Sequence, residues 1–408
     1  MHWVEQDGGT FGGTCGLNKV LFTGGSHSEL PMIEAAKAKG YYVITTGNDE
    51  GMIGHKTADK YVKGDYSDKD FVLDLAKQEG VDAIVSGAND FAYISTAYAC
   101  EKLGLPGHDT YETARTIHIK DRFRAVTESI GIRTPKIRKC SDTDECMRAA
   151  KEIGFPLLVK PVDLTGGKGV KVCIEMNEAV AAFNEAMKLT REDHVILEQF
   201  IEGSPHGFTS LIKDGKVVFH MLDNEQYGIN KYLVLGASSP SDIPQHAEFT
   251  LINNVERLAE HCGLVDGLFH TQFIVDASGY PVMIDPCRRA PGDLYVLLAK
   301  YVTGVDYPSE IVNAECGGDV KDSYISEHNF VARECIMTSR RGVIKDVIVE
   351  DELKPFIIYT HMGDNHGVMV EQPMKHKAGI LIMQFDSYEK MTDIVKRFSE
   401  LAWIEFED

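Results

Sequence analysis

Short apolar runs alternate with helix-like segments through residues 18–115, and this alternation constrains the fold more than any other feature. We predict strands within 19–25, 41–47, 61–66 and 81–90, and helices over about 28–39, 68–80 and an Ala-rich segment ending at KLGLPG. Strands that alternate with helices form a parallel, doubly wound sheet. Buried parallel strands are nearly continuous apolar runs, as these are. The sequence therefore predicts a Rossmann-like α/β domain over residues 18–115.

The first predicted strand ends in Gly24-Gly25, which could mark a nucleotide site or a tight turn. The full GxGxxG spacing is missing, and no acidic residue follows at the distance that a dinucleotide site requires. A strand-to-helix turn needs small residues for steric reasons alone. Both interpretations remain open here, and the turn is favoured.

From Cys140 onward the pattern changes to strands separated by tight turns, which predicts an α+β region with antiparallel sheets. Before it, IKDRFRAVTESIGIRTPK reads as an amphipathic helix that ends at a Gly and a Pro. The turns KDGK and DASGY predict hairpins. The segment YEKMTDIVKRFSELA predicts one last helix.

The bulk composition excludes several classes of protein. The chain has 408 residues, of which 43% are hydrophobic and 25% charged, and no apolar stretch approaches the length of a membrane span. The formal net charge of -20 argues against binding to nucleic acid over a broad surface. The nine cysteines show no zinc spacing, which is typical of reduced thiols in the cytoplasm. Residues 1–17 read as a disordered leader without signal-peptide features.

The strongest local motif is LLVKPVDLTGGKGVKV, in which a strand presents Lys160 and three glycines follow in a loop. Such a loop lets backbone N–H groups approach phosphate oxygens, and the lysine adds a point charge. The motif is not a Walker A loop, because no GK[ST] opens a helix. A Gly-rich hairpin on a solvated surface is the alternative interpretation.

The order of the pieces resembles the ATP-grasp superfamily, in the branch of biotin carboxylase, carbamoyl phosphate synthetase and the L-amino acid ligases. Lys120 comes first, Lys160 with its Gly loop second, ILEQFIEGSPH third, and TQFIV with PVMIDPCRRAPG last. The resemblance runs from about residue 18 to the C-terminus. It implies an ATP-grasp domain over 116–320 with a small lid at about 140–198, and a C-terminal part over 321–408 that completes the module.

The resemblance implies that ATP lies between the lid and the larger part. Lys120 and Lys160 would contact its phosphates, and the loop from Thr165 through Gly166 and Gly167 to Gly169 would close over them. Glu198 would face the adenine amino group, beside the backbone of Phe200 and Ile201. His206 would lie near the ribose, unless it is a surface loop residue.

The metal site departs from the family pattern, in which an acidic residue on one strand precedes E-h-N-x-R on the next. Gln272 stands at the first position, as in carbamoyl phosphate synthetases, and Asp285 replaces the Glu. Cys287 replaces the Asn, although Mg²⁺ and Mn²⁺ prefer oxygen ligands. The resemblance gives Gln272 and Asp285 as metal ligands. A strand that simply ends in a turn at Asp285 is the structural alternative.

Arg289 falls on the family's arginine position and Arg288 does not. The resemblance therefore implies that Arg289 stabilises the transferring phosphoryl group or binds a substrate carboxylate, with Asp285 as its catalytic neighbour. Two solvated surface arginines are the alternative. The acceptor pocket is expected from residues 223–245, with Tyr227, Asn230 and Tyr232, and from the region after Gly292.

The resemblance predicts an ATP-dependent ligase that joins a carboxylate to an amine through an acyl phosphate, releasing ADP and phosphate. Its partners would be small-molecule carboxylates and amines, with no nucleic acid or membrane, and a homodimer is compatible with it. Two alternatives remain. One is a carboxylating enzyme like biotin carboxylase or carbamoyl phosphate synthetase. The other is a degenerate nucleotide-binding protein, which Gln272 and Cys287 would favour.

Overall fold

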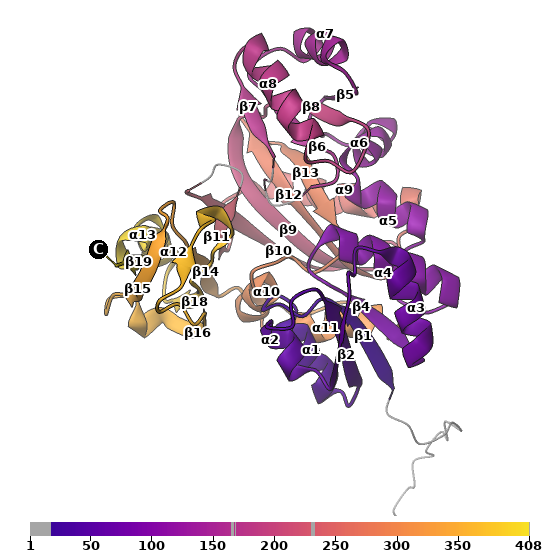
Figure 1. Ribbon diagram of the computed structural model, residues 1–408, viewed down its shortest axis with the longest axis vertical. Helices are drawn as coiled ribbons and strands as arrows, with labels where there is room; N and C mark the ends of the chain where they lie inside the picture. Colours follow the sequence, from indigo (N-terminus) through magenta and orange to yellow (C-terminus); the bar gives the residue numbers. More distant parts are fainter. Residues whose placement is uncertain (1–17, 165–166, 168, 230–232, 408) are drawn as a thin grey trace, which may run out of the picture.

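A computed structural model gives the structure of the protein and describes residues 18–407 except 165–166, 168 and 230–232 (Figure 1). The predicted leader, residues 1–17, and the loop residues Thr165 and Gly166 lie outside the described residues, as do Asn230 and Tyr232. Four sheets organise the described chain: one parallel sheet, a small antiparallel sheet, a large antiparallel sheet and a short three-stranded one.

The parallel sheet contains β1 (Lys19–Thr23), β2 (Tyr42–Gly47), β3 (Lys60–Lys63) and β4 (Ala83–Ser86) in the order β3-β2-β1-β4. The four predicted strands and their parallel arrangement are confirmed. The helices α1 (Leu30–Ala38), α3 (Lys69–Glu79) and α4 (Asp90–Leu103) agree with the prediction, and α2 (Ile53–Thr57) and α5 (Tyr111–His118) are additional. Asp68 caps α3 and Asn89 caps α4, each by accepting backbone N–H groups.

The small antiparallel sheet stands at the top of Figure 1 and has the order β5-β8-β6-β7. Its strands are β5 (Ile137–Cys140), β6 (Leu157–Pro161), β7 (Lys171–Cys173) and β8 (Val195–Gln199). Leu157 and Val159 face a core made with α7 (Thr143–Ile153) and α8 (Met176–Met187). Because side chains alternate across a strand, Lys160 points to the opposite face, toward the large sheet.

The large sheet has eight strands in the order β13-β12-β9-β10-β11-β14-β18-β16. Its bounds are β9 (Gly203–Lys213), β10 (Lys216–Tyr227), β11 (Val234–Ser239), β12 (Gly267–Asp276), β13 (Pro281–Cys287), β14 (Phe330–Ile336), β16 (Ile357–Met362) and β18 (Gly379–Phe385). On one face, α6 (Lys120–Ser129) and α9 (Gln245–Cys262) join a core with Phe208 and Phe273. The other face packs on α10 (Tyr295–Thr303) and α11 (Tyr307–Glu315).

Residues after 321 divide between two sheets. Strands β14, β16 and β18 extend the large sheet, while β15 (Gly342–Val349), β17 (Met369–Val370) and β19 (Ala402–Phe406) form the three-stranded one at the left of Figure 1. Two short 3-10 helices occupy Lys354–Phe356 and Pro373–Lys375.

The single last helix predicted from the sequence is wrong. It is split into α12 (Tyr388–Lys396) and α13 (Phe398–Leu401), because the backbone at Arg397 leaves the helical region. The residues that follow, rich in types that favour strands, pair with β15 as β19.

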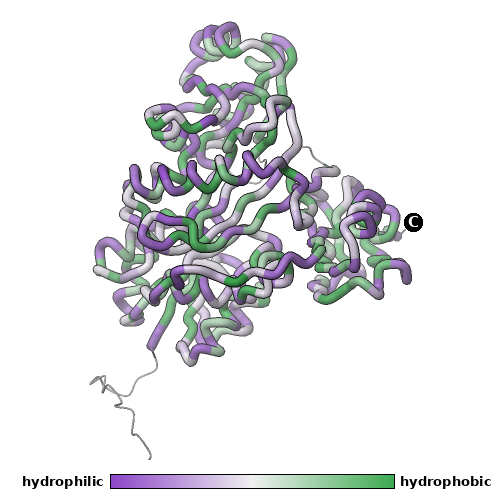
Figure 2. Tube along the Cα trace, turned by 180° about the vertical axis from the view of Figure 1, so that it is seen from behind, coloured by the Kyte–Doolittle hydropathy of each residue, from purple (hydrophilic) through white to green (hydrophobic). Residues whose placement is uncertain are grey.

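The hydropathy of the helices follows their packing. In Figure 2 helices seen from behind alternate between hydrophilic and hydrophobic residues, as expected for helices with one buried face. Within the described residues no helix combines the length and apolar character needed to cross a membrane. The eight cysteines that the structure describes are all free thiols.

Candidate nucleotide and metal site

Lys160 and Glu198 form the centre of the site, on the face of the small sheet that is not covered by α7 and α8. Antiparallel pairing of β6 and β8 sets Lys160 opposite Ile196 and therefore diagonal to Glu198. Lys160 Nζ donates a 2.5 Å hydrogen bond to Glu198 Oε1. Both side chains are buried, so each charge depends on the other.

Helix α6 adds two more cations, because Lys120 and Arg124 lie four residues apart on one helical face. Arg124 Nη2 donates to Glu198 Oε2 at 3.1 Å. Its Nε and Nη1 are buried and have no hydrogen-bond partner among the described residues. Lys160 and Arg124 thus share one carboxylate, and Lys120 adds a third positive charge, which leaves local positive charge in a strongly acidic protein.

The Gly loop joins this cluster. Lys120 Nζ donates to the carbonyl of Leu164, in the loop that follows β6, at 2.8 Å. Gly167 and Gly169 have φ angles of 70° and 72°, which side chains other than Gly adopt at a cost. The structure therefore brings Lys120 against Leu164, at the start of the loop that follows Lys160.

Asp285, near the end of β13, belongs to the same charge cluster. Burial raises the pKa of its carboxyl, but the charges of Lys120, Lys160 and Arg124 outweigh burial and hold the pKa below its usual value. The side chain keeps partial exposure. The ionised, partly accessible Asp285 carboxylate is able to bind a metal cation, while the three neighbouring cations are able to bind an anion.

Arg289 is oriented by Asp90, the first residue of α4 in the N-terminal part of the chain. Its Nε donates to Asp90 Oδ1 at 2.9 Å, and His118 Nδ1 lies 3.2 Å from the same oxygen. Arg289 and His118 lower the pKa of Asp90 although burial raises it. The first residue of α4 thus fixes the direction of the guanidinium.

Arg288 has a structural role. Its Nε donates to Asp109 Oδ2 at 2.9 Å, and its other nitrogens donate to the carbonyls of Leu268 and Val265. With 3% of its surface exposed, it is not a solvated arginine. The alternative of two surface arginines is therefore wrong, and the catalytic role assigned to Arg289 stays a prediction.

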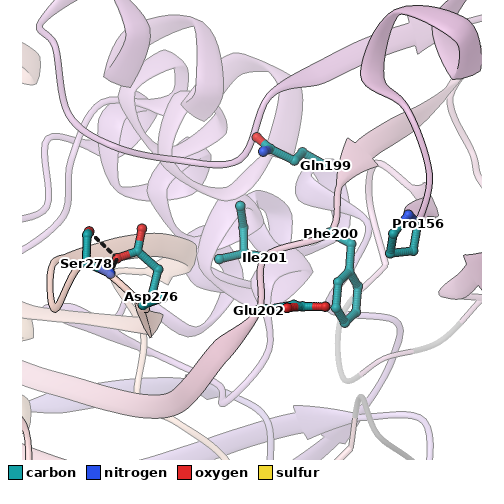
Figure 3. Close-up of a pocket in the computed structure, with 8 residues that line it drawn as sticks. Pro156, Gln199, Phe200, Ile201, Glu202, Asp276 and Ser278 are labelled. Atoms are coloured by element: carbon teal, nitrogen blue, oxygen red, sulfur yellow. Dashed lines mark hydrogen bonds between the residues drawn. The ribbon is translucent and has the colours of Figure 1, made fainter.

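Phe200 and Ile201 lie in the segment between β8 and β9, which connects the small sheet to the large one. Together with Gln199 and Pro156 they line a hollow of about 370 Å³ (Figure 3). Its far side is the hairpin turn with Asp276 and Ser278. Glu198 does not line this hollow, and both of its oxygens accept from cations, so its predicted contact with adenine stays a prediction.

His206 lies on β9 with 2% of its surface exposed, so the surface-loop alternative is wrong. Its ring stacks on Phe273 at 5.3 Å between centroids, and its nitrogens contact the hydroxyls of Ser204 and Ser241 at 2.7 and 3.1 Å. Burial lowers the pKa of the imidazole. Its predicted place near a ribose remains a prediction.

The two candidate oxygen donors for a metal, Gln272 and Asp285, lie on β12 and β13. Gln272 on β12 donates its amide N–H to Glu225 Oε1 on β10 at 2.6 Å, which leaves its amide oxygen for another partner. Glu225 also accepts from Tyr227 at 2.5 Å, and burial, then the charge of Asp223, raises its pKa to about 8. Mg²⁺ needs only one or two protein carboxylates beside phosphates and water. Asp285 and Gln272 fit that requirement.

Cys287 does not fit it. Burial raises the pKa of its thiol to about 11, and the thiol donates to the carbonyl of Arg289 at 3.4 Å. A protonated thiol is neither a nucleophile nor a ligand for a hard cation. Among the residues the structure describes, no group of three or more His, Cys, Asp or Glu side chains could hold a metal alone.

His270 lies on β12, two residues before Gln272. Burial, then the charge of Arg289, lowers the pKa of His270 to about 3, and the ring meets Tyr295 edge-on at 5.0 Å. His270 is therefore a neutral, buried side chain.

Comparison with known proteins identifies the family. The profile of the phosphoribosylglycinamide synthetase ATP-grasp (A) domain matches residues 119–290, the stretch that carries the described cluster except for Asp90 and His118. Residues 119–290 therefore form an ATP-grasp domain. The resemblance read from the order of Lys120, Lys160 and Asp285 is thereby confirmed.

Relatives within the ATP-grasp superfamily are distant. The carbamoyl phosphate synthase large chain, C-terminal section, of Methanopyrus kandleri is 24% identical over 249 residues, 59% of this chain and 46% of that protein. The alanine–anticapsin ligase of Bacillus subtilis is 23% identical over 291 residues, 65% of this chain and 61% of that protein. The chain thus spans about half the length of the curated relatives it matches. An L-amino acid ligase from Bacillus licheniformis shares the fold, with a TM-score of 0.80, 18% identity, and coverage of 96% and 99% of the two chains.

Three residues of the ATP-grasp site were missed by sequence reasoning. Arg124 could have been found, because it lies one helical turn after Lys120. Asp90 and Glu225 gave no local signal, since their partners Arg289 and Gln272 are 199 and 47 residues away.

Proposed function

We propose that the protein is an ATP-dependent carboxylate–amine ligase that makes an amide or peptide bond through an acyl phosphate and releases ADP and phosphate. The observation that carries the proposal is the convergence of Lys120, Lys160 and Arg124 on Asp285, with buried guanidinium N–H groups of Arg124 that find no partner among the described residues. The excess positive charge could bind the negative phosphates of ATP, and the Asp285 carboxylate could bind a metal ion that accompanies them.

The proposed first step is phosphoryl transfer. A carboxylate oxygen of the substrate attacks the γ-phosphorus, the bond to the β,γ-bridging oxygen breaks, and ADP leaves with the electron pair. Lys120 and Lys160 bind the phosphates, and the loop from Thr165 to Gly169 covers them. Arg289, oriented by Asp90, stabilises the charge on the transferring group.

The proposed second step is amide formation. The amine nitrogen attacks the acyl carbon, the carbon–oxygen bond to phosphate breaks, and the nitrogen loses a proton to phosphate or solvent. Asp285 and Gln272 would hold Mg²⁺ or Mn²⁺, which when bound neutralises phosphate charge. Positioning and electrostatics supply the rate enhancement, because the described site offers no ionised thiol.

The domain assignments accompany this proposal. Residues 18–115 act as a Rossmann-like domain, about 140–198 as a lid that carries Lys160, and 321–408 as the part that completes the ATP-grasp module. Support for a lid comes from the separate small sheet, joined to the large sheet by the short connection at 200–202. Adenine would contact the backbone of that connection, with Glu198 nearby and His206 toward the ribose.

Phosphate release tests the proposal. Purified protein with ATP and Mg²⁺ is screened against the proteinogenic amino acids, singly and in pairs, and against sugar acids. Asp285→Asn should lower turnover on the order of a hundredfold. Asp386→Asn is the matched control, since it makes the same chemical change at an exposed position remote from the site. Equal loss in both variants, or full activity of Asp285→Asn, would refute the assigned role of Asp285.

Two rival functions make different predictions. A carboxylating enzyme, which Gln272 at the first ligand position would allow, cleaves ATP when bicarbonate is the only carboxylate offered. A degenerate nucleotide-binding protein, which the protonated Cys287 favours, binds ATP equally with Mg²⁺ or with a chelator and releases no phosphate.

A further inference from the structure

A second cavity lies at the carboxyl edge of the parallel sheet, apart from the nucleotide site. It has a volume of about 190 Å³ and is walled by the turn after β1, the turn after β2 and the residues before α4. Ligands of open parallel sheets bind at this edge, where the chain crosses from one side of the sheet to the other. The cavity is smaller than a typical pocket for a drug-sized molecule, so its ligand is small.

Gly24 and Gly25 belong to this cavity, but their packing explains them without a nucleotide. A Cβ on Gly24 would lie 2.9 Å from the carboxyl of Glu29, and one on Gly25 would lie 2.1 Å from the ring of His55. Glu29 accepts hydrogen bonds from the backbone N–H groups of Ser26 and Ala88, both at 2.7 Å. The Glu29 carboxylate thus already accepts from the backbone N–H groups that a bound phosphate would need.

The charges around the cavity disfavour an anionic ligand. Its lining includes the carboxylates of Glu29 and Asp49, and no Lys or Arg from the described chain lines it. Burial, the largest effect, lowers the pKa of His55, which keeps the imidazole neutral near pH 7. Burial and then the charge of Glu29 raise the pKa of the Tyr66 phenol. The negative charge of Glu29 therefore acts on Tyr66, another residue of the lining.

One buried polar atom in the lining lacks a partner. His55 is 5% exposed, its Nδ1 contacts the hydroxyl of Thr45 at 2.9 Å, and its Nε2 has no hydrogen-bond partner within the part of the chain that the structure describes. Leaving a buried nitrogen unpaired costs about 1–3 kcal/mol, which a ligand hydrogen bond would recover. Tyr66 and Asn89, bonded to each other at 3.0 Å, supply further polar groups.

The cavity shares its walls with the segment that carries Arg289. Asn89 lines it and directly precedes Asp90, the partner of Arg289. Ser28 lines it too, and its Oγ accepts from the backbone N–H of Asp293 at 2.9 Å. A molecule in the cavity would therefore lie beside the loop that we assign to phosphoryl transfer.

We propose that this cavity binds the amine substrate, as a small ammonium-bearing molecule recognised by Glu29, Asp49 and the polar groups around His55. The proposal rests on the ligase function and deepens it. It places the acceptor amine between the parallel sheet and the Arg289 loop, whereas the sequence pointed to residues 223–245 and to the region after Gly292, of which Asp293 contacts the cavity residue Ser28.

Calorimetric binding to the full-length protein with ADP and Mg²⁺ tests the proposal without turnover. The probe is L-alaninamide, an amine whose blocked carboxyl cannot accept a phosphoryl group, and propionamide is the same molecule without the ammonium. We expect the wild-type protein to bind alaninamide and not propionamide. Asp49→Lys should weaken the binding of alaninamide at least tenfold, because it reverses a charge at the rim.

Glu50→Lys is the matched control, since it makes the same charge reversal at the neighbouring residue, which does not line the cavity. It should change binding by less than twofold. Asn48→Trp, which blocks the rim by size, should also weaken binding. Equal binding of the two probes, no binding of alaninamide to the wild type, or equal effects of Asp49→Lys and Glu50→Lys would overturn the proposal.

Hydroxylamine separates this inference from the ligase function. Wild-type protein that forms acyl phosphates should convert amino acids and hydroxylamine to hydroxamates with ADP release. Hydroxamates together with alaninamide binding that Asp49→Lys does not alter would leave the ligase function standing and remove the cavity assignment. Alaninamide binding that follows the predicted pattern, without hydroxamates from any carboxylate, would keep the cavity and remove the ligase function.

Discussion

Replacing Glu198 by Gln should show how strongly Lys160 and Arg124 depend on the one carboxylate that they share. Glu198 is 1% exposed and accepts from Lys160 at 2.5 Å and from Arg124 at 3.1 Å. The glutamine keeps the size of the side chain and removes its charge. Two buried cations would then face each other without compensation.

The structure sets the expected size of the effect. Breaking a buried ion pair by removing one partner costs about 3–5 kcal/mol, because the remaining charge stays buried. The pair Arg138–Glu152 makes a matched control, since both of its side chains are about half exposed, at 48% and 56%. Such surface pairs contribute only about 0–1 kcal/mol, so Glu152→Gln should have little effect.

Urea denaturation of the two variants measures this difference, and hydrogen exchange in β6 and β8 locates it. We expect Glu198→Gln to lose several times more stability than Glu152→Gln. ATP with Mg²⁺ should restore part of the loss, because the triphosphate supplies the missing negative charge. Equal stability of the two variants would show that the buried cations are not held by Glu198, and the charge argument for the site would fail.

Three further predictions concern single residues. Lys160→Ala should abolish most of the rise in melting temperature that ADP with Mg²⁺ causes in the wild type, and an unchanged rise would remove Lys160 from the phosphate site. Asp285→Asn should weaken the Mg²⁺ dependence of nucleotide binding, whereas Cys287→Asn, which adds an oxygen donor, should strengthen it; equal shifts would contradict the metal site. The pKa of His270 is about 3 in the fold and about 6.5 when unfolded, so its stabilisation is present above pH 6.5 and falls with pH below that. His270→Asn should therefore flatten the loss of stability between pH 6 and 4, by up to about 1.4 kcal/mol per pH unit, and an unchanged slope in urea titrations would refute the assignment.

Local patterns predicted those parts of the molecule that local physics determines. The buried parallel strands β1 and β4 follow from continuous apolar runs, and α3 ends where Gly80 takes a left-handed conformation. Lys160 was singled out because it and the glycines that follow form a contiguous motif, and its contact with phosphate stays a prediction.

Long-range pairings were beyond the reach of the sequence. Nothing near Asp90 shows that it meets Arg289, and nothing near Glu225 shows that it meets Gln272. The break at Arg397 was missed because an amphipathic pattern continues across it, and the pairing of β19 with β15 decides the geometry there. Tertiary contacts override helical periodicity at this position.

The counter-ions of Arg288 and Arg289 limit how freely this chain can be recombined. Both arginines follow β13, yet Asp109 and Asp90 reach them from the first 115 residues. A chimaera that takes residues 18–115 from a relative must therefore bring acidic side chains to positions 90 and 109. Without them, two guanidinium groups would lie in the protein interior without a counter-ion, and the loop that carries Arg289 would lose its alignment although residues 119–290 were unchanged. Exchange of the N-terminal segment therefore has to preserve the ion pairs that Asp90 and Asp109 form with Arg289 and Arg288.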